Sequence, residues 1–314
     1  MSSGGALIDV AGIRVGHAQN ATARTGCTAV LLPDTGAVCG VDVRGSAPGT
    51  RETDLLGPTA LVDVVHAIVL TGGSAFGLDS ACGVVAFLEE RNVGLVVGPW
   101  RIPIVTAAVL FDLFVGDGSV RPDRAMGYDA ASAANDGEIR EGRIGAGAGA
   151  TVGKLAGPQH ATPSGLGQAA RRSGPLVVAA LAVANAVGSV YDPRTHERLA
   201  GPRAPDGSFL DDAVLLANPS AFGAPPPAGA NTTLAVVATN ARLRKVEATK
   251  VAQIAHDGLA RAVVPAHLSR DGDTIFACAT GVEDAPVDLV GTLAAEAVAE
   301  AIARGVRAAQ SALA

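Results

Sequence analysis

Three short segments combine residue types that could do chemistry, and each indicates a different kind of site. Gly145–Lys154 (GAGAGATVGK) is glycine-rich and ends in lysine, as phosphate-binding loops do. Ser74, in LTGGSAFGLD, lies at an expected turn between a strand and a helix, where hydrolases can hold a nucleophile. Asn231-Thr232 places a hydroxyl residue where a proline-rich loop enters an expected strand. The residues alone leave the choice among these segments open.

The nucleotide interpretation of Gly145–Lys154 does not match either common motif. A Walker loop needs glycine at position 148 and Ser or Thr at position 155, where this chain has Ala148 and Leu155. A Rossmann fingerprint placed on the same glycines lacks the acidic residue that binds ribose about twenty residues later. Close packing of the glycine backbone is therefore the favoured interpretation.

Ser74 departs from the nucleophile-elbow pattern G-x-S-x-G because Phe76 occupies the second glycine position. His256 and His267 follow later in the chain and would complete a triad only through their arrangement in space. The alternative is that Ser74 caps a helix after a tight turn. His256, within AHDGLAR, is expected to be a packed helical residue rather than a catalyst.

Composition limits the classes of partner. The net charge of −6 and the absence of a basic stretch argue against nucleic acid, and Arg171-Arg172 is expected to be a solvated turn in a loop. The four cysteines lack C-x-x-C spacing, so we expect small buried residues and no metal site: Cys27, Cys39, Cys82 and Cys278. No secretory signal is visible at the N-terminus, and the apolar stretch Pro175–Val190 is too short to span a membrane, so it is expected to be a buried strand or helix. These features together predict a cytoplasmic protein.

The elements that position these segments alternate between strands and helices. Short β-branched runs bounded by Gly, Pro or Asp predict strands at Ala6–Val10, Cys27–Leu32, Ala37–Val43, Ala67–Leu70 and Val93–Val97. Apolar residues at helical spacing predict a helix over Gly77–Glu90.

The last third of the chain has a simple expected order. Pro219–Ala230 (PSAFGAPPPAGA) must be a loop because its prolines lack backbone donors. Thr232–Ala238 and Asp273–Thr280 read as strands, and Arg244–Ala262 and Val287–Ala312 read as amphipathic helices. A β-α-β-α unit is therefore expected to begin at Thr232.

The segment from Asn231 to Gly281, NTTLAVVATNARLRKVEATKVAQIAHDGLARAVVPAHLSRDGDTIFACATG, resembles the DmpA-type aminopeptidase family, whose relatives include the nylon-oligomer amidases. The stretches that begin at Val41, Ala67 and Gly142 agree with it, so the likeness covers nearly the whole chain. The resemblance implies an α/β fold, a four-layer αββα sandwich of the N-terminal-nucleophile type. It implies one domain over 1–314 that cleaves itself into a large chain, 1–231, and a small chain, 232–314.

Several residues match the nylon-hydrolase branch of that family by motif. Thr232, preceded by Asn231, matches its nucleophile and cleavage site, and Asp271 and Asp273 match its Asp-x-Asp pair. Lys154 matches a lysine at the end of the glycine-rich segment.

Two further positions carry over, one of them with a departure. Asn185, in VANAVGSV, matches an asparagine attributed to oxyanion binding. Phe111 stands where the nylon-hydrolase branch has a tyrosine, so a hydroxyl that could touch the substrate is absent. Apart from the resemblance, Asp271 and Asp273 are also compatible with a solvated turn, and Asn185 with a core hydrogen bond.

The chemistry that the resemblance implies suits these residue types. Self-cleavage would free the α-amine of Thr232, whose ordinary pKa of about 7.7–8.0 makes it a base for the residue's own hydroxyl. Small peptides, amino-acyl amides or esters would be the substrates, with no metal or organic cofactor and a homo-oligomeric assembly. Two alternatives remain: an acyltransferase of the ornithine-acetyltransferase type, and an unprocessed, inactive binding or scaffold protein.

Overall fold

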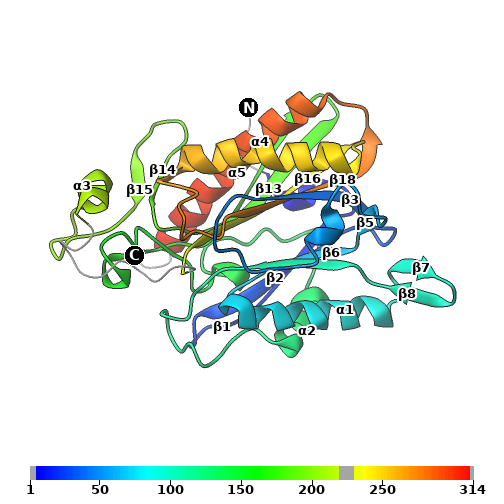
Figure 1. The fold of residues 1–314 in the computed structure, drawn as a ribbon, viewed down its shortest axis with the longest axis horizontal. Helices are drawn as coiled ribbons and strands as arrows, with labels where there is room; N and C mark the ends of the chain where they lie inside the picture. The colour runs from blue at the N-terminus through cyan, green and yellow to red at the C-terminus, as the bar shows by residue number, and fades with distance from the viewer. Residues whose placement is uncertain (1–4, 219–229, 312–314) are drawn as a thin grey trace.

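Two β-sheets stacked face to face between two pairs of helices form the body of the protein (Figure 1). The computed structural model describes residues 5–218 and 230–311. The six-stranded sheet has the order β12 (Leu166–Ser173), β13 (Leu176–Asn185), β16 (Thr232–Ala241), β18 (Thr274–Glu283), β3 (Ala37–Val43) and β5 (Val64–Val65). The five-stranded sheet has the order β1 (Arg14–Asn20), β2 (Thr25–Leu31), β6 (Ala67–Thr71), β9 (Val105–Val109) and β4 (Thr50–Arg51). These layers confirm the expected αββα arrangement.

The helices cover the outer faces of the two sheets. Helices α4 (Lys245–Ala262) and α5 (Val287–Ser311) pack on the six-stranded sheet, and α1 (Ser80–Glu90) and α2 (Arg124–Ser132) pack on the five-stranded sheet (Figure 1). A short helix, α3 (Asp212–Ala217), lies at one end of the molecule. In the part of the chain that the structure describes, no helix combines the length and apolar character needed to cross a membrane.

Small residues let these layers approach closely. Strand β13 is buried on both faces: Ala180, Ala182 and Ala184 face α4 and α5, while the residues between them face the other sheet. The backbones of β12 and α5 nearly touch, because a Cβ added at Gly167 would lie 2.1 Å from the Ala301 carbonyl oxygen. The alanine- and glycine-rich composition is therefore what allows four tightly packed layers.

The centre of the six-stranded sheet positions the candidate site. Strand β16 runs antiparallel to β13 and parallel to β18, with α4 as the crossover between β16 and β18. Parallel strands begin at the same edge of a sheet, so the residues that precede β16 and β18 are neighbours. Asn231 and Asp271 form an isolated parallel bridge there.

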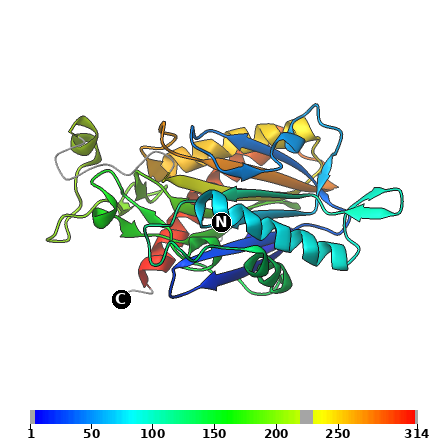
Figure 2. The same cartoon turned by 60° about the horizontal axis from the view of Figure 1, so that its bottom comes forward.

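Three smaller sheets complete the part of the chain that the structure describes. They are the hairpin β7 (Leu95–Val97) and β8 (Trp100–Ile102), the pair β10 (Thr151–Val152) and β11 (Thr162–Pro163), and a sheet of β14 (Ser189–Tyr191), β15 (Arg198–Ala200) and β17 (Val263–Val264). The β7–β8 hairpin projects from the body in both views (Figure 2).

Most expected elements are present. The expected strands correspond to β2, β3, β6, β7, β16 and β18, the apolar stretch Pro175–Val190 contains β13, and the expected C-terminal helices correspond to α4 and α5. The helix expected over Gly77–Glu90 begins later, at Ser80, after a 3-10 turn. The proline-rich loop lies outside the described residues except for Ala230.

Four expectations were wrong. Cys82 is half-buried, whereas the other three cysteines are buried as expected. Ala6–Val10 contains a 3-10 helix, Leu7–Asp9, because its buried positions follow no two-residue alternation. Arg171 and Arg172 lie in β12 rather than in a loop, and Arg171 is mostly buried against Glu296 and Glu300. Ser74 makes no capping hydrogen bond through its side chain and instead has left-handed backbone (φ +54°) at the start of a 3-10 turn.

Candidate active site

The Asn231–Thr232 peptide lies at the buried start of β16. Asn231 is fully buried, Thr232 is 3% exposed, and Thr232 pairs across the sheet with Asn185 at the end of β13. The Thr232 hydroxyl lies 2.5 Å from the carbonyl oxygen of Asn231, within hydrogen-bonding distance. The backbone N–H of Gly272 donates to the same oxygen at 2.8 Å. Two donors therefore converge on the carbonyl that precedes Thr232.

Asp271 and Asp273 are both 2% exposed, so neither is a solvated turn residue. Asp273 accepts a hydrogen bond from Thr233 N–H through Oδ1 at 2.6 Å. Asp271 accepts from Leu268 N–H through Oδ2, whereas its Oδ1 is buried without a partner in the described part of the chain. Burial, and next the charge of Asp273, raise the pKa of Asp271 to about 6.

Lys154 reaches the same region from the end of the glycine-rich segment. Its Nζ donates to Asn185 Oδ1 at 2.8 Å, to Asn185 O at 3.0 Å and to Ala230 O at 3.4 Å. Burial lowers the pKa of Lys154 to about 7, although the charges of Asp271 and Asp112 act in the opposite direction. The site thus holds an ammonium group that can lose its proton near neutral pH.

Asn185 has partners at both ends of its side-chain amide. Its Oδ1 accepts from Lys154 and from Thr151 N–H, and its Nδ2 donates to the Phe111 carbonyl oxygen at 2.9 Å. In this uncut chain the amide therefore makes core hydrogen bonds, and its role as an oxyanion donor stays a prediction. The half-buried Phe111 packs its ring against Phe114, with centroids 4.9 Å apart.

The glycine-rich segment packs closely against its neighbours. A Cβ added at Gly145, where φ is +52°, would lie 2.3 Å from Thr28 Oγ1, and one at Gly149 would lie 2.2 Å from Arg24 O. Close backbone packing is thus the correct interpretation of Gly145–Lys154. The segment carries Lys154 to the end of β13.

Two nearby residues were not identified from the sequence. Gly272 has no side chain to block the nucleophile, because a Cβ there would lie 2.6 Å from Thr232 Oγ1. Asp112 is buried, accepts from Gly73 N–H at 2.7 Å, and has a pKa raised chiefly by burial. The sequence signal for Gly272 was its place between two aspartates, and the signal for Asp112 was its place directly after Phe111.

The histidines do not join Ser74. The rings of His256 and His267 pack edge to face, with centroids 4.8 Å apart. His256 Nε2 lies 3.1 Å from the Asp42 carbonyl oxygen, whereas His267 Nδ1 lies 2.8 Å from Asp273 Oδ2. Sequence reasoning missed this contact between His267 and Asp273.

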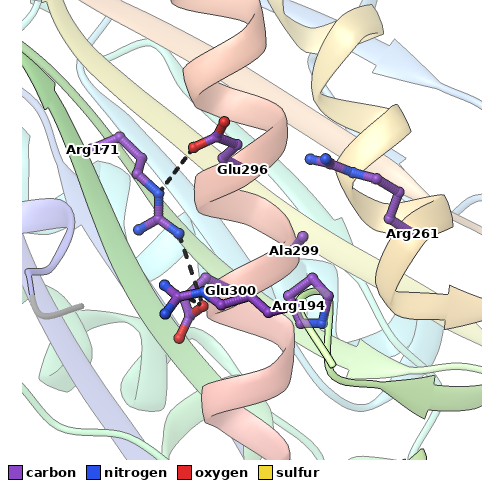
Figure 3. A pocket seen from close by; sticks show the side chains of 7 residues that line it. Arg171, Arg194, Arg261, Glu296, Ala299 and Glu300 are labelled. Carbon is purple, nitrogen blue, oxygen red and sulfur yellow. Dashed lines mark hydrogen bonds and ion pairs between the residues drawn. The ribbon is translucent and has the colours of Figure 1, made fainter. Parts of the chain in front are cut away.

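A cavity of about 390 Å³ lies away from these residues, between β12, α4 and α5 (Figure 3). Its lining comprises Arg171, Pro193, Arg194, Arg261, Glu296, Ala299 and Glu300. Arg171 bridges Glu296 (3.3 Å) and Glu300 (3.8 Å), and Arg194 pairs with Glu300 (3.2 Å). We call it the arginine-lined cavity.

Comparison with known proteins gives this geometry a context. The model of Peptidase family S58 matches residues 5–314. The chain belongs to peptidase family S58. This confirms the DmpA-type resemblance, and membership makes the chain a hydrolase of peptide or amide bonds.

Sequence relatives of this S58 member carry hydrolase names. An uncharacterized aminopeptidase of Mycobacterium tuberculosis is 41% identical over 97% of this chain and 94% of its own length. A 6-aminohexanoate-oligomer endohydrolase of Kocuria sp. is 33% identical over 88% of this chain and 76% of its own length.

Two solved structures share the fold of this S58 chain. A Burkholderia sp. β-aminopeptidase has a TM-score of 0.70 and 24% identity, over 98% of this chain and 88% of that one. The L-aminopeptidase D-Ala-esterase/amidase of Ochrobactrum anthropi, a variant of the Ntn hydrolase fold, has a TM-score of 0.72 and 19% identity over the same shares. These likenesses confirm the N-terminal-nucleophile type of sandwich.

Proposed function

We propose that this S58 hydrolase cuts its own backbone between Asn231 and Thr232 and then uses Thr232 to hydrolyse small amides and peptides. The observation that carries the proposal is the Asn231 carbonyl. Its oxygen lies 2.5 Å from the Thr232 hydroxyl and 2.8 Å from the Gly272 N–H, inside a buried peptide. A nucleophile and an oxyanion donor thus meet at one peptide bond.

In the self-cleavage step, Thr232 Oγ attacks the Asn231 carbonyl carbon. The carbonyl oxygen gains negative charge, which the Gly272 N–H is placed to stabilise. The C–N bond then breaks, its nitrogen takes a proton, and an ester joins the Asn231 carbonyl to Thr232 Oγ. Water hydrolyses this ester and leaves a free carboxylate on Asn231 and a free amine on Thr232.

Two groups that titrate near neutral pH flank this peptide and suit the proton transfers. Asp271 bridges to Asn231 and has a pKa of about 6, while Lys154 contacts the Ala230 carbonyl and has a pKa of about 7. We assign to this pair the proton that leaves the Thr232 hydroxyl and the proton that the departing nitrogen takes up. General acid and base groups work best when their pKa lies near the working pH.

In turnover, the freed α-amine of Thr232 would act as base for its own hydroxyl, and β-branching would restrict the angle of attack. Asn185, which pairs with Thr232 across β13 and β16, is our proposed oxyanion donor for the substrate. Asp273 accepts a hydrogen bond from the N–H of Thr233 and thereby orients the start of β16.

The proposed substrates are short peptides, amino-acyl amides and esters. The aminopeptidase and endohydrolase names of the relatives support this class. Phe111 provides no hydroxyl at its position, so we place nylon-type oligomers outside the preferred substrates. We further propose processed chains of 1–231 and 232–314 that assemble as a homo-oligomer in the cytoplasm.

The test begins with the mass of the purified protein. We expect two fragments, and N-terminal sequencing of the smaller one should read TTLAVVATNA. Thr232→Ala should give an uncut, inactive chain that remains folded, and Thr233→Val, beside it, should still be cut. A fragment that starts at Thr233 would move the nucleophile by one residue, and normal processing of Thr232→Ala would overturn the proposal.

A second measurement separates hydrolysis from acyl transfer. Product analysis with and without an added acceptor amine should show the same free acid in both cases. Transfer of the acyl group to the amine would favour the acyltransferase alternative. One uncut band together with no turnover would favour an inactive scaffold.

A further inference from the structure

His267 contacts the carboxylate oxygen of Asp273 that Thr233 does not contact. Its Nδ1 lies 2.8 Å from Asp273 Oδ2, and its backbone N–H donates to the same oxygen at 3.2 Å. The other oxygen, Oδ1, accepts from Thr233 N–H. Because a carboxylate can only accept hydrogen bonds, Nδ1 must carry a hydrogen in this contact.

The backbone of His267 makes this double contact possible. Its φ of +57° is left-handed, a conformation that is uncommon outside glycine and is several-fold enriched in Asn, Asp and His. In this conformation the backbone N–H and the imidazole of one residue both reach the same carboxylate oxygen. An uncommon backbone at a site of buried polar groups is an observation from which a functional role can be inferred.

The imidazole is in turn supported from behind. The ring of His256, on α4, packs edge to face against His267. His256 Nε2 contacts the Asp42 carbonyl oxygen on β3. Contacts therefore run from β3 and α4 through both histidines to Asp273, and from Asp273 to the residue that follows the nucleophile.

We propose that His267 is a positioning residue: its Nδ1–H fixes the rotation of the Asp273 carboxylate and, through Thr233 N–H, the place of Thr232 in self-cleavage and turnover. The inference rests on the proposed function. Without the imidazole donor, Asp273 keeps a single backbone donor on Oδ2 and can rotate away from Thr233. The nucleophile would then spend less time at the carbonyl that it attacks.

Two substitutions separate the donor from the backbone conformation. His267→Gly keeps the left-handed turn and the backbone N–H but removes Nδ1. In His267→Asn, the asparagine can adopt the same left-handed turn. Its Nδ2 is separated from Cα by the same number of bonds as His Nδ1, since both atoms are attached to Cγ, so it offers an N–H donor in a similar place. His196→Gly is the matched control, because His196 is an exposed histidine that also has left-handed backbone (φ +58°).

The measurements are precursor conversion followed by intact mass, and kcat and KM for an amino-acyl anilide. We expect His267→Gly to slow both conversion and kcat about 10–100-fold, because misplacing a nucleophile by about 1 Å can cost about 10² in rate, with KM unchanged. His267→Asn should recover most of the loss, and His196→Gly should match the wild type. A thermal melt of each variant checks folding.

The outcomes separate this inference from the proposed function. A folded His267→Gly variant that converts and turns over normally overturns the inference alone, as does a folded His267→Asn variant that is as slow as His267→Gly. Should Thr232→Ala still be cut, the proposed function fails whatever His267 does.

Discussion

The Thr232 site and the arginine-lined cavity satisfy their polar groups in opposite ways. The cavity has a volume of about 390 Å³, and in it Arg171 and Arg194 meet the carboxylates of Glu296 and Glu300 in ion pairs (Figure 3). The residues of the Thr232 site are nearly fully buried, and several of their polar atoms lack partners among the described residues. These are both side-chain polar atoms of Asn231, Asp271 Oδ1, Thr233 Oγ1 and His267 Nε2.

The difference teaches where to look for chemistry in this fold. Buried polar groups in folded proteins are nearly always hydrogen-bonded, so a concentration of unpartnered ones requires an explanation. Lowered and raised pKa values occur in the same place, at Lys154 and Asp271. Buried groups without hydrogen-bond partners mark the proposed reactive edge of the sheet.

The largest effect expected from this contrast is at Asp273. Asp273→Asn should slow self-cleavage and anilide hydrolysis by about 10² or more, because Asp273 orients the start of β16 and a nucleophile misplaced by about 1 Å can lose about 10² in rate. An amide would keep the contact with Thr233 N–H but would turn an NH₂ group toward the two donors of His267. Conversion followed by mass, and rates across pH 5–9, measure the effect.

An exposed turn aspartate provides the control for that experiment. Asp206 accepts from Ser208 N–H and Oγ in a surface turn, so Asp206→Asn should leave both rates unchanged. Equal, near-normal rates for Asp273→Asn and Asp206→Asn would remove the carboxylate from the mechanism and break the contrast.

A smaller effect is expected in the pH dependence of stability, measured on the uncut Thr232→Ala chain. Lys154 has a pKa of about 7 when folded and 10.5 as its ordinary value. Between these values the unfolded chain holds the proton and the native chain does not, so stability contributed by this group rises with pH. Asp271 has the opposite sign, because its pKa is raised from 3.8 to about 6 and the native chain holds the extra proton in that window.

We therefore compare Lys154→Met with the Lys154 chain, both in the Thr232→Ala background. The stability of the Lys154→Met chain relative to that of the Lys154 chain should fall as pH rises from 7 to 10. Thermal melts at several pH values measure this, and 1 kcal/mol moves the Tm of a large domain by roughly 2–4 °C. A Tm difference that stays constant over this pH range would show that Lys154 does not titrate there.

The smallest effect is expected in the arginine-lined cavity. Arg194 is largely exposed, so Arg194→Ala should change stability by less than about 1 kcal/mol and leave kcat and KM unchanged. Arg171→Ala should cost more stability, since Arg171 is mostly buried and pairs with two carboxylates. A change in kcat or KM in either variant would give the cavity a part in turnover and weaken the contrast.

Local sequence patterns predicted an element correctly where a single pattern of residue types indicated its conformation. The β-branched run after Thr232 and the helical spacing in Arg244–Ala262 each indicated the correct element. Arg171 was misplaced because the glycine and serine around it indicate a loop, while its partners Glu296 and Glu300 come from a helix far along the chain. Such pairing leaves no local signal.

The candidate site divides in the same way. Lys154, Asn185, Asp271 and Asp273 were identified from motifs, and the structure brings them to one edge of the sheet. Gly272 was missed because its importance lies in the register of β16 against β18, which places the Thr232 hydroxyl where a Cβ would be. The function of His267 likewise depends on a left-handed backbone that its residue type permits but does not dictate.

The order of strands around β16 has a consequence for the unfolding and refolding of the cut protein. Strands β16 and β18 lie side by side between β13 and β3, so these two strands of the small chain would sit between strands of the large chain. Unfolding the cut protein would then be a dissociation, and refolding would become a second-order reaction that depends on protein concentration. The lifetime of the folded mature enzyme would be set by the rate at which these interleaved strands separate, because reassociation of the two separated chains would be slow.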